Sequence, residues 1–255
     1  MDVTFERLFR APYSVPNALE RVEEGVWIAD QISDRVALVN AISDRVALVN
    51  AGPVGDYGVT FRQREIPSDC SNTSGMAVGE QALWLAANGE AALWRVGREV
   101  DAQPGAGEIL KVDPATGQTL MRRPVPTGGG VHGIEYDHVD EGHLWITTLR
   151  EKTLTQVQTS DWATKQVIPL PYGRAHGVVR TDVGVWVIHS SERVIVLLDT
   201  DDGRELDRIV VPDSEPEPHG LSAWDDGALA YCDATSGWVV VIRPAAASAQ
   251  LNHRL

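Results

Sequence analysis

Short runs of valine, isoleucine, leucine and threonine recur along the whole chain, and glycine, aspartate, asparagine and proline separate them. These residue types suit short antiparallel strands joined by turns. No helical stretch of consequence interrupts the pattern. The pattern therefore predicts an all-β protein.

The runs belong to a unit that occurs five times, with a short strand, a turn, a second strand with an aromatic residue, and two further strands. The first halves of the copies read NALERVEEGVWIAD from Asn17, SGMAVGEQALWLAA from Ser74, HGIEYDHVDEGHLWITT from His132, HGVVRTDVGVWVIH from His176 and HGLSAWDDGALAYCD from His219. Internal similarity with a period of about 40–50 residues is typical of β-propellers and solenoids.

The fifth copy lacks a fourth strand, and residues 3–9 resemble one. We therefore predict one closed β-propeller domain over residues 1–255, with five blades of four antiparallel strands and the N-terminal strand in the last blade. Closure of the ring protects strand edges that would otherwise be open to aggregation. The expected blades are 17–67, 74–126, 132–171, 176–212, and 219–244 with 3–9, followed by a tail at 245–255.

Two copies are longer than the others, which leaves a count of six blades open. In the first copy, Ala41–Asn50 (AISDRVALVN) nearly repeats the ten residues before it, and without it the copy has the usual length. In the second copy, Arg95–Gly107 is interpreted as an inserted loop. Five blades are therefore the predicted number.

A His-Gly pair opens three of the five copies. The histidines are His132, His176 and His219, spaced 44 and 43 residues apart. In a closed ring, equivalent residues of different blades converge on one mouth of the central channel. Three neutral imidazoles there suit Zn²⁺ or another borderline divalent ion, with a position left for water or substrate. We therefore expect a divalent metal at this site, Zn²⁺ or Mg²⁺. Without a metal, one histidine can act as a general base. The alternative is a structural histidine that bonds a turn of its own blade.

Further candidates are expected at the same mouth. His189, at the end of VWVIHSS, is a fourth catalytic candidate, although a residue in that place also suits a structural hydrogen bond. The binding candidates are Asn17 and Ser74, which replace the histidine in the first two copies, and Tyr172, Arg174 and Glu217, which precede inner strands. The guanidinium of Arg174 is shaped to bind a carboxylate or phosphate, with a surface ion pair as the alternative.

Charge and composition narrow the range of partners. The chain has 36 acidic and 22 basic residues and a formal charge of −14, which is unsuited to nucleic acid or an anionic membrane. No apolar run approaches the ~18 residues of a membrane-spanning helix, and MDVTFERLFR does not read as a secretory signal. The two cysteines, Cys70 and Cys232, fit neither a disulfide framework nor a metal knuckle. We expect a cytoplasmic monomer that binds a small molecule.

The motif HGI…GHLWIT…TLTQV…IPLPYGRAHGV resembles the repeat of the streptogramin (virginiamycin B) lyase family, which is related to the NHL-repeat and gluconolactonase-like propellers. The resemblance implies a propeller fold. It also implies metal-assisted opening of a cyclic depsipeptide by elimination, with histidine and glutamate at the central mouth. The position of the family's glutamate holds Asp30, Ala87, Thr148, His189 and Asp233 in the five copies.

Residues and resemblance together predict a lyase or hydrolase. It would act on a small or cyclic ester-like molecule at a central, histidine-lined site that holds a divalent metal. The alternative function is a non-catalytic propeller that binds a ligand or a partner protein.

Overall fold

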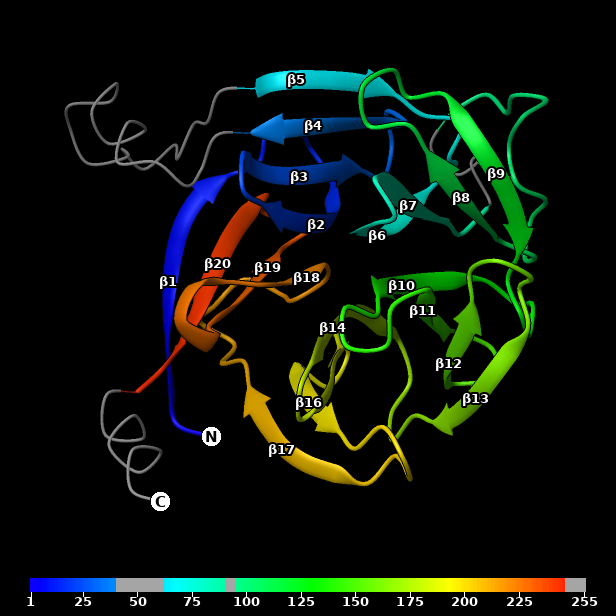
Figure 1. Cartoon of the computed structure of the whole chain (residues 1–255). Coiled ribbons are helices and arrows are strands. Elements are labelled where there is room, and N and C mark those ends of the chain that lie inside the picture. Colours follow the sequence, from blue (N-terminus) through cyan, green and yellow to red (C-terminus); the bar gives the residue numbers. More distant parts are fainter. Residues whose placement is uncertain (40–61, 90–94, 246–255) are drawn as a thin grey trace.

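The computed structural model of the chain describes residues 1–39, 62–89 and 95–245. These residues form five four-stranded antiparallel sheets, arranged as blades around a central axis (Figure 1). The prediction of an all-β propeller with five blades is confirmed. The near-duplicate segment 41–50 and the tail beyond residue 245 lie outside the described residues.

In each blade the first strand lies at the axis and the later ones follow outward. Blades 1 and 2 consist of β2 (Pro16–Val22), β3 (Gly25–Asp30), β4 (Arg35–Val39) and β5 (Arg62–Pro67), then β6 (Thr73–Gly79), β7 (Ala82–Ala87), β8 (Glu108–Val112) and β9 (Thr119–Pro124). Blades 3 and 4 consist of β10 (Val131–Tyr136), β11 (His143–Thr148), β12 (Thr153–Gln158) and β13 (Thr164–Pro169), then β14 (Ala175–Thr181), β15 (Gly184–His189), β16 (Val194–Leu198) and β17 (Glu205–Val210).

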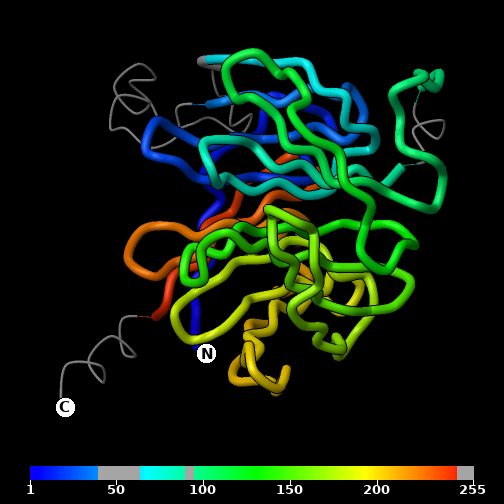
Figure 2. Tube along the Cα trace, turned by 45° about the vertical axis from the view of Figure 1, so that its right-hand side comes forward, coloured from blue at the N-terminus to red at the C-terminus, as the bar shows by residue number. Residues whose placement is uncertain are grey.

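Blade 5 combines the two ends of the described chain. It consists of β18 (Leu221–Ala223), β19 (Leu229–Cys232), β20 (Trp238–Pro244) and β1 (Val3–Arg10). β1 pairs antiparallel with β20, with Phe5 opposite Ile242, and the two run side by side in Figure 2. The predicted closure by the N-terminal strand is confirmed. Within the described part of the chain, no helix has the length and apolar character needed to cross a membrane.

The apolar core is divided among the contacts between neighbouring blades. Five clusters of buried side chains are present in the described residues, and each draws its members from two adjacent blades. Between blades 2 and 3, for example, Trp84 of β7 packs with Ile134 and Tyr136 of β10. Burial of this apolar surface therefore holds the blades to one another as well as stabilising each sheet.

Around the axis the inner strands approach one another so closely that side chains are excluded at one position. A Cβ atom on Gly133 would overlap with the carbonyl oxygen of His176 in the next blade, and one on Gly75 would overlap with that of His132. The N–H of Gly177 donates a hydrogen bond of 2.8 Å to the carbonyl of His219. Packing between blades thus requires the glycine of the His-Gly pair. It does not require the histidine.

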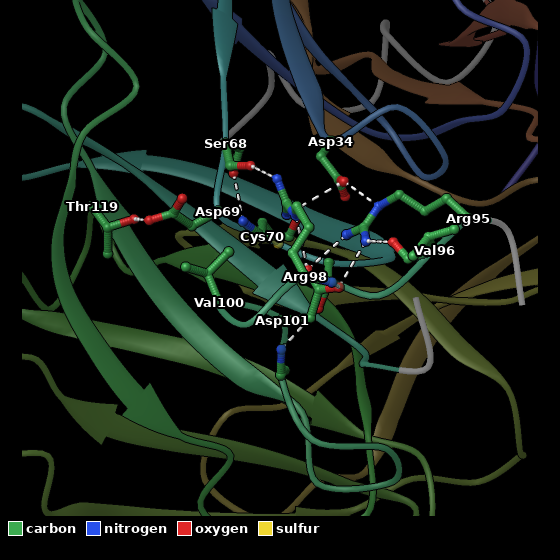
Figure 3. Close-up of polar contacts among 12 residues, drawn as sticks. Asp34, Ser68, Asp69, Cys70, Arg95, Val96, Arg98, Val100, Asp101 and Thr119 are labelled. Atoms are coloured by element: carbon green, nitrogen blue, oxygen red, sulfur yellow. Dashed lines mark hydrogen bonds and ion pairs between the residues drawn. The ribbon is translucent and has the colours of Figure 1, made fainter. Parts of the chain in front are cut away.

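The inserted loop of blade 2 is fixed to blade 1 by an ionic network (Figure 3). The guanidinium of Arg95 donates to Asp34 through Nε at 2.5 Å and to both oxygens of Asp101 at 2.7 Å. Arg98 donates to Asp101 at 3.0 Å and to the carbonyl of Ser68 at 3.2 Å. Asp34 is only 6% exposed, so its charge depends on these guanidiniums.

Replacing Arg95 with alanine should lower the free energy of unfolding by about 1–3 kcal/mol, because it leaves a buried carboxylate with fewer partners. These bonds hold the pKa of Asp101 well below its usual range. A carboxyl with a lowered folded-state pKa contributes stability that is lost as pH falls, so Arg95→Ala should also flatten the decline of stability in acid. Urea unfolding between pH 3 and 7 measures both effects. Arg204→Ala, an exposed arginine of blade 4, is the control; an equal loss in the two variants would contradict the assignment.

Candidate functional site

The three histidines of the His-Gly pairs meet at one end of the axis. The ring centroids of His132 and His176 are 4.2 Å apart with an edge-to-face arrangement, and those of His176 and His219 are 4.8 Å apart. His176 is 2% exposed and His219 is 5% exposed. Residues 44 and 43 positions apart in the sequence therefore form one continuous group of imidazoles.

A local irregularity of the inner strands holds two of these histidines, His132 and His176. The pairing of β10 with β11 skips from Val131 to Ile134, and that of β14 with β15 skips from Ala175 to Val178. His132 and His176 lie within these bulges, and the same break occurs around the equivalent residues of blades 1 and 2. Bulges of this kind turn a side chain out of the ladder and are common beside active sites.

The ring nitrogens differ in their hydrogen bonding. Nδ1 of His132 and both nitrogens of His176 are buried without a hydrogen-bond partner in the described part of the molecule. Nδ1 of His219 lies 3.2 Å from the carbonyl oxygen of Glu217 and 3.9 Å from the carboxylate of Asp233. A carbonyl only accepts, so Nδ1 of His219 carries the proton and its Nε2 has the free lone pair.

Burial keeps all three rings neutral. It lowers the pKa of His132 to about 3, and the charges of His219 and Arg174 contribute in the same direction. Burial likewise lowers the pKa of His176 well below its usual range. The pKa of His219 is also lowered by burial, but the Glu217 and Asp233 carboxylates oppose this effect. Since a base works best with a pKa near the working pH, His219 is the best placed of the three to accept a proton.

A charged pair, Arg174 and Glu217, lies close enough to the histidines to affect their pKa values. Nη1 of Arg174 lies 3.3 Å from Oε1 of Glu217, and the arginine side chain is half exposed. Arg174 has a φ of 46°, in the left-handed region. The equivalent residues of blades 2 and 3 are Asn72 and Gly130, which adopt that region more readily. Backbone strain at a residue beside a cluster of buried imidazoles is typical of a functional site.

Replacing Arg174 with asparagine should raise the free energy of unfolding by roughly 0.5–1 kcal/mol. Asparagine tolerates the left-handed region better than arginine, and the exposed pair with Glu217 contributes little to stability. Thermal and urea unfolding measure the change. Arg204→Asn removes the same charge at the opposite end of blade 4 and is expected to be neutral. A destabilised Arg174→Asn protein would show that the arginine serves the fold.

The other predicted site residues differ in their hydrogen-bond partners. The hydroxyl of Ser74 donates to the carbonyl of Asn72 at 2.9 Å, whereas Oδ1 of the buried Asn17 has no hydrogen-bond partner in the described residues. Tyr172 accepts from Arg208 of the outermost strand at 3.0 Å, so its hydroxyl points away from the three histidines. His189 lies against the Tyr172 ring at 5.3 Å, and its Nδ1 is 3.1 Å from the carbonyl of Gly173.

The sequence predicts a divalent metal ion among the three histidines, whose ring nitrogens would be its ligands. Imidazole nitrogens without partners are suitable ligands for Zn²⁺. In the residues that the structure describes, however, no group of three or more His, Cys, Asp or Glu side chains is arranged to hold a metal ion. The divalent metal on His132, His176 and His219 therefore stays a prediction.

Asp233 was missed as a site residue by reasoning from sequence. It follows β19 and lies beside His219, with Oδ1 at 3.9 Å from Nδ1. Its position matches Asp30 and His189 at the ends of the second strands of blades 1 and 4. A polar residue in that place, next to a histidine of the same blade, was the available signal.

The fold and the site define a five-bladed β-propeller with a cluster of neutral histidines at one mouth of its axis. No protein-family model and no curated protein matches the chain. Among solved structures it is similar to a streptogramin B lyase, with a TM-score of 0.52 and 14% identity over 94% of this chain and 97% of that one.

Two other structures extend the comparison. Myxococcus xanthus glutaminyl cyclase matches with a TM-score of 0.62 and 11% identity, over 94% of this chain and 96% of that one. A catalytically inactive virginiamycin B lyase from Staphylococcus aureus with quinupristin matches with a TM-score of 0.51 and 16% identity, over 92% of this chain and 68% of that one. At these identities the comparisons establish the propeller fold, which the predicted resemblance implied.

Proposed function

We propose that this protein is an enzyme of lyase or hydrolase type that acts on a small or cyclic ester-like molecule. The observation that carries the proposal is the contact of three neutral imidazoles from three blades, with the charge of Arg174 close by. Two of these rings have nitrogens without partners in the described residues, a costly arrangement unless a ligand uses them. The likeness in fold to two lyases and a cyclase, which are enzymes, supports the same conclusion.

His219 takes the role of general base in this proposal. The Glu217 carbonyl orients its ring, and the charge of the Asp233 carboxylate, 3.9 Å away, stabilises the imidazolium that forms. In an elimination, Nε2 of His219 removes a proton from the carbon adjacent to the one that bears the ester oxygen. The released electron pair forms a carbon–carbon double bond, the C–O bond breaks, and the carboxylate departs. In a hydrolysis, Nε2 instead removes a proton from the water that attacks the ester carbonyl. The tetrahedral intermediate then collapses, the acyl C–O bond breaks, and the alcohol leaves with the proton that His219 returns to it.

Arg174 binds the negative charge of the substrate or leaving group. Its guanidinium presents paired N–H donors that match a carboxylate, and it stands close enough to the histidines to affect the pKa of each of them. His132 and His176, which stay neutral, can donate to or accept from the ester group. The substrate class that suits this set is an ester whose scission releases a carboxylate.

Incubation with quinupristin and a panel of cyclic and linear esters tests the proposal, with products analysed by mass spectrometry. Elimination opens a ring without changing its mass, whereas hydrolysis adds the mass of one water, so the reaction type is read directly. The expected result is ring opening of at least one ester. Metal analysis of the purified protein, and assay with and without a chelator, test the prediction of a divalent metal on His132, His176 and His219.

The alternative of a non-catalytic binding protein predicts a different outcome. In that case no ester is turned over, while a ligand that binds the wild type also binds a His219→Ala variant with unchanged affinity. These two results together would contradict the proposal that the protein is an enzyme.

A further inference from the structure

Two glutamates occupy the inner strands deeper in the propeller. Glu20 of β2 and Glu135 of β10 each follow the site position of their blade, Asn17 or His132, by three residues. Glu20 is 8% exposed and Glu135 is 4% exposed. The equivalent residue of blade 2, between them, is Ala77, which contributes only a methyl group. The two carboxyls therefore belong to one layer of the axis, on blades 1 and 3.

Within the described residues, each carboxyl has one oxygen without a hydrogen-bond partner. Oε1 of Glu135 accepts from the N–H of Arg180 at 3.2 Å, and the Ser222 hydroxyl bonds the Glu20 side chain. Oε2 of Glu20 and Oε2 of Glu135 are buried and have no hydrogen-bond partner in the described residues. An ionised carboxylate in this state is costly, so the pair needs a compensating proton or cation.

The charged groups around the pair do not supply that compensation. Arg21 of β2 forms an ion pair with Asp225, and Arg180 of β14 has its Nε 3.4 Å from the carboxylate of Asp137. The guanidinium of Arg180 also donates to the carbonyl of Gly184 at 3.1 Å. Both arginines are thus directed at other partners, while β6 and β18 contribute no titratable side chain.

We propose that Glu20 and Glu135 form a proton-binding carboxyl pair, which holds a proton at the axis between blades 1 and 3 at neutral pH. Burial raises the pKa of Glu20 to about 8. Burial, followed by the charge of Glu20, raises the pKa of Glu135, and Asp137 adds to the rise. Two carboxyls that repel in this way lose their protons in separate steps that belong to the pair. The proposal is independent of the function assigned to the histidines.

The pair makes the stability of the propeller decline as pH rises from the acidic to the neutral range. A group whose folded-state pKa lies above its unfolded value contributes stability that is present at low pH and is lost as pH rises through the folded pKa. For Glu20 this window runs from its ordinary pKa of 4.5 to about 8. Over the window the ratio of folded to unfolded protein should fall by about tenfold per pH unit for each proton released on unfolding.

The test compares the wild type with the double variant Glu20→Gln, Glu135→Gln by urea unfolding between pH 5 and 9. The amides keep the shape but bind no proton, so the decline with pH should be weaker in the variant by that factor. Glu151→Gln, an exposed glutamate of the turn after β11, should retain the wild-type decline. An identical decline in the wild type and the double variant would overturn the proposal.

A second measurement does not depend on the variants being stable. Infrared difference spectra of the wild type between pH 6 and 10 should show loss of the C=O band of a protonated carboxylic acid, and Glu135→Gln should alter that band. Absence of a band from a protonated acid at pH 7 would overturn the proposal. So would stabilisation by Ca²⁺ of the wild type but not of the double variant, because the pair would then bind a cation in place of the proton.

Discussion

Replacing Gly133 with alanine should destabilise the protein by about 3 kcal/mol, which corresponds to a fall of roughly 10 °C in melting temperature for a chain of this size. The added Cβ would overlap with the carbonyl oxygen and carbon of His176 and with a methyl group of Val178, so the backbones of blades 3 and 4 would have to separate. Flexible side chains cannot relieve this overlap, because the main obstacle is backbone. Thermal and urea unfolding measure the loss.

Gly97→Ala provides the matched control for this prediction. Its Cβ would meet nothing closer than the Asp101 carboxylate at 3.9 Å, and its backbone does not lie in the left-handed region. The control is expected to be neutral or slightly stabilising. If the two variants unfold alike, the close approach of the inner strands is not a requirement of the fold.

Replacing His219 with alanine should reduce the turnover of an ester substrate by about 10²–10⁴-fold, the usual contribution of a general base. His219→Asn should lose as much activity while it keeps a donor for the Glu217 carbonyl, which separates the loss of the base from a loss of structure. Since the lowered pKa of His219 leaves its ring neutral at pH 7, the activity of the wild type should decline toward acidic pH only when the ring becomes protonated, below the ordinary range of a histidine.

His138→Ala is the control for the histidine series, because His138 is exposed and lies in the turn after β10. It should retain wild-type turnover and an unchanged pH profile. Full activity in His219→Asn would transfer the role of base to another group, and the profile of kcat against pH in His132 and His176 variants would then identify it.

The fold was predictable from the sequence because each blade of a propeller corresponds to one copy of a sequence repeat. Five copies of one pattern gave the number of blades, and the missing fourth strand of the last copy gave the pairing of Val3–Arg10 with Trp238–Pro244. The convergence of His132, His176 and His219 on one end of the axis followed from the same reasoning. Each of these inferences needs only the order and equivalence of positions in a closed ring.

The remaining features of the site depend on distances across the axis, which repetition does not encode. The contact of Asp233 with His219 depends on how the end of β19 turns toward the mouth. The left-handed backbone of Arg174 could not be inferred from its residue type, because arginine rarely adopts this region. The equivalent positions of blades 2 and 3 hold asparagine and glycine, which adopt it more readily. Tyr172 looked equivalent to its neighbours in the loop, yet the competing guanidinium of Arg208 draws its hydroxyl outward.

The pairing of β1 with β20 has a consequence for synthesis of the chain. Of the described strands, β1 leaves the ribosome first and β20 leaves it last, so blade 5 is completed only when translation of the domain is almost finished. Until then β1 lacks its partner strand β20, and its edge can pair with a strand of another chain. Its sequence VTFERLFR places Glu6 and Arg7 between apolar residues and Arg10 at its end. Charges of this kind oppose the pairing of strand edges from different molecules. The strand that closes the ring thus carries its own protection against premature association.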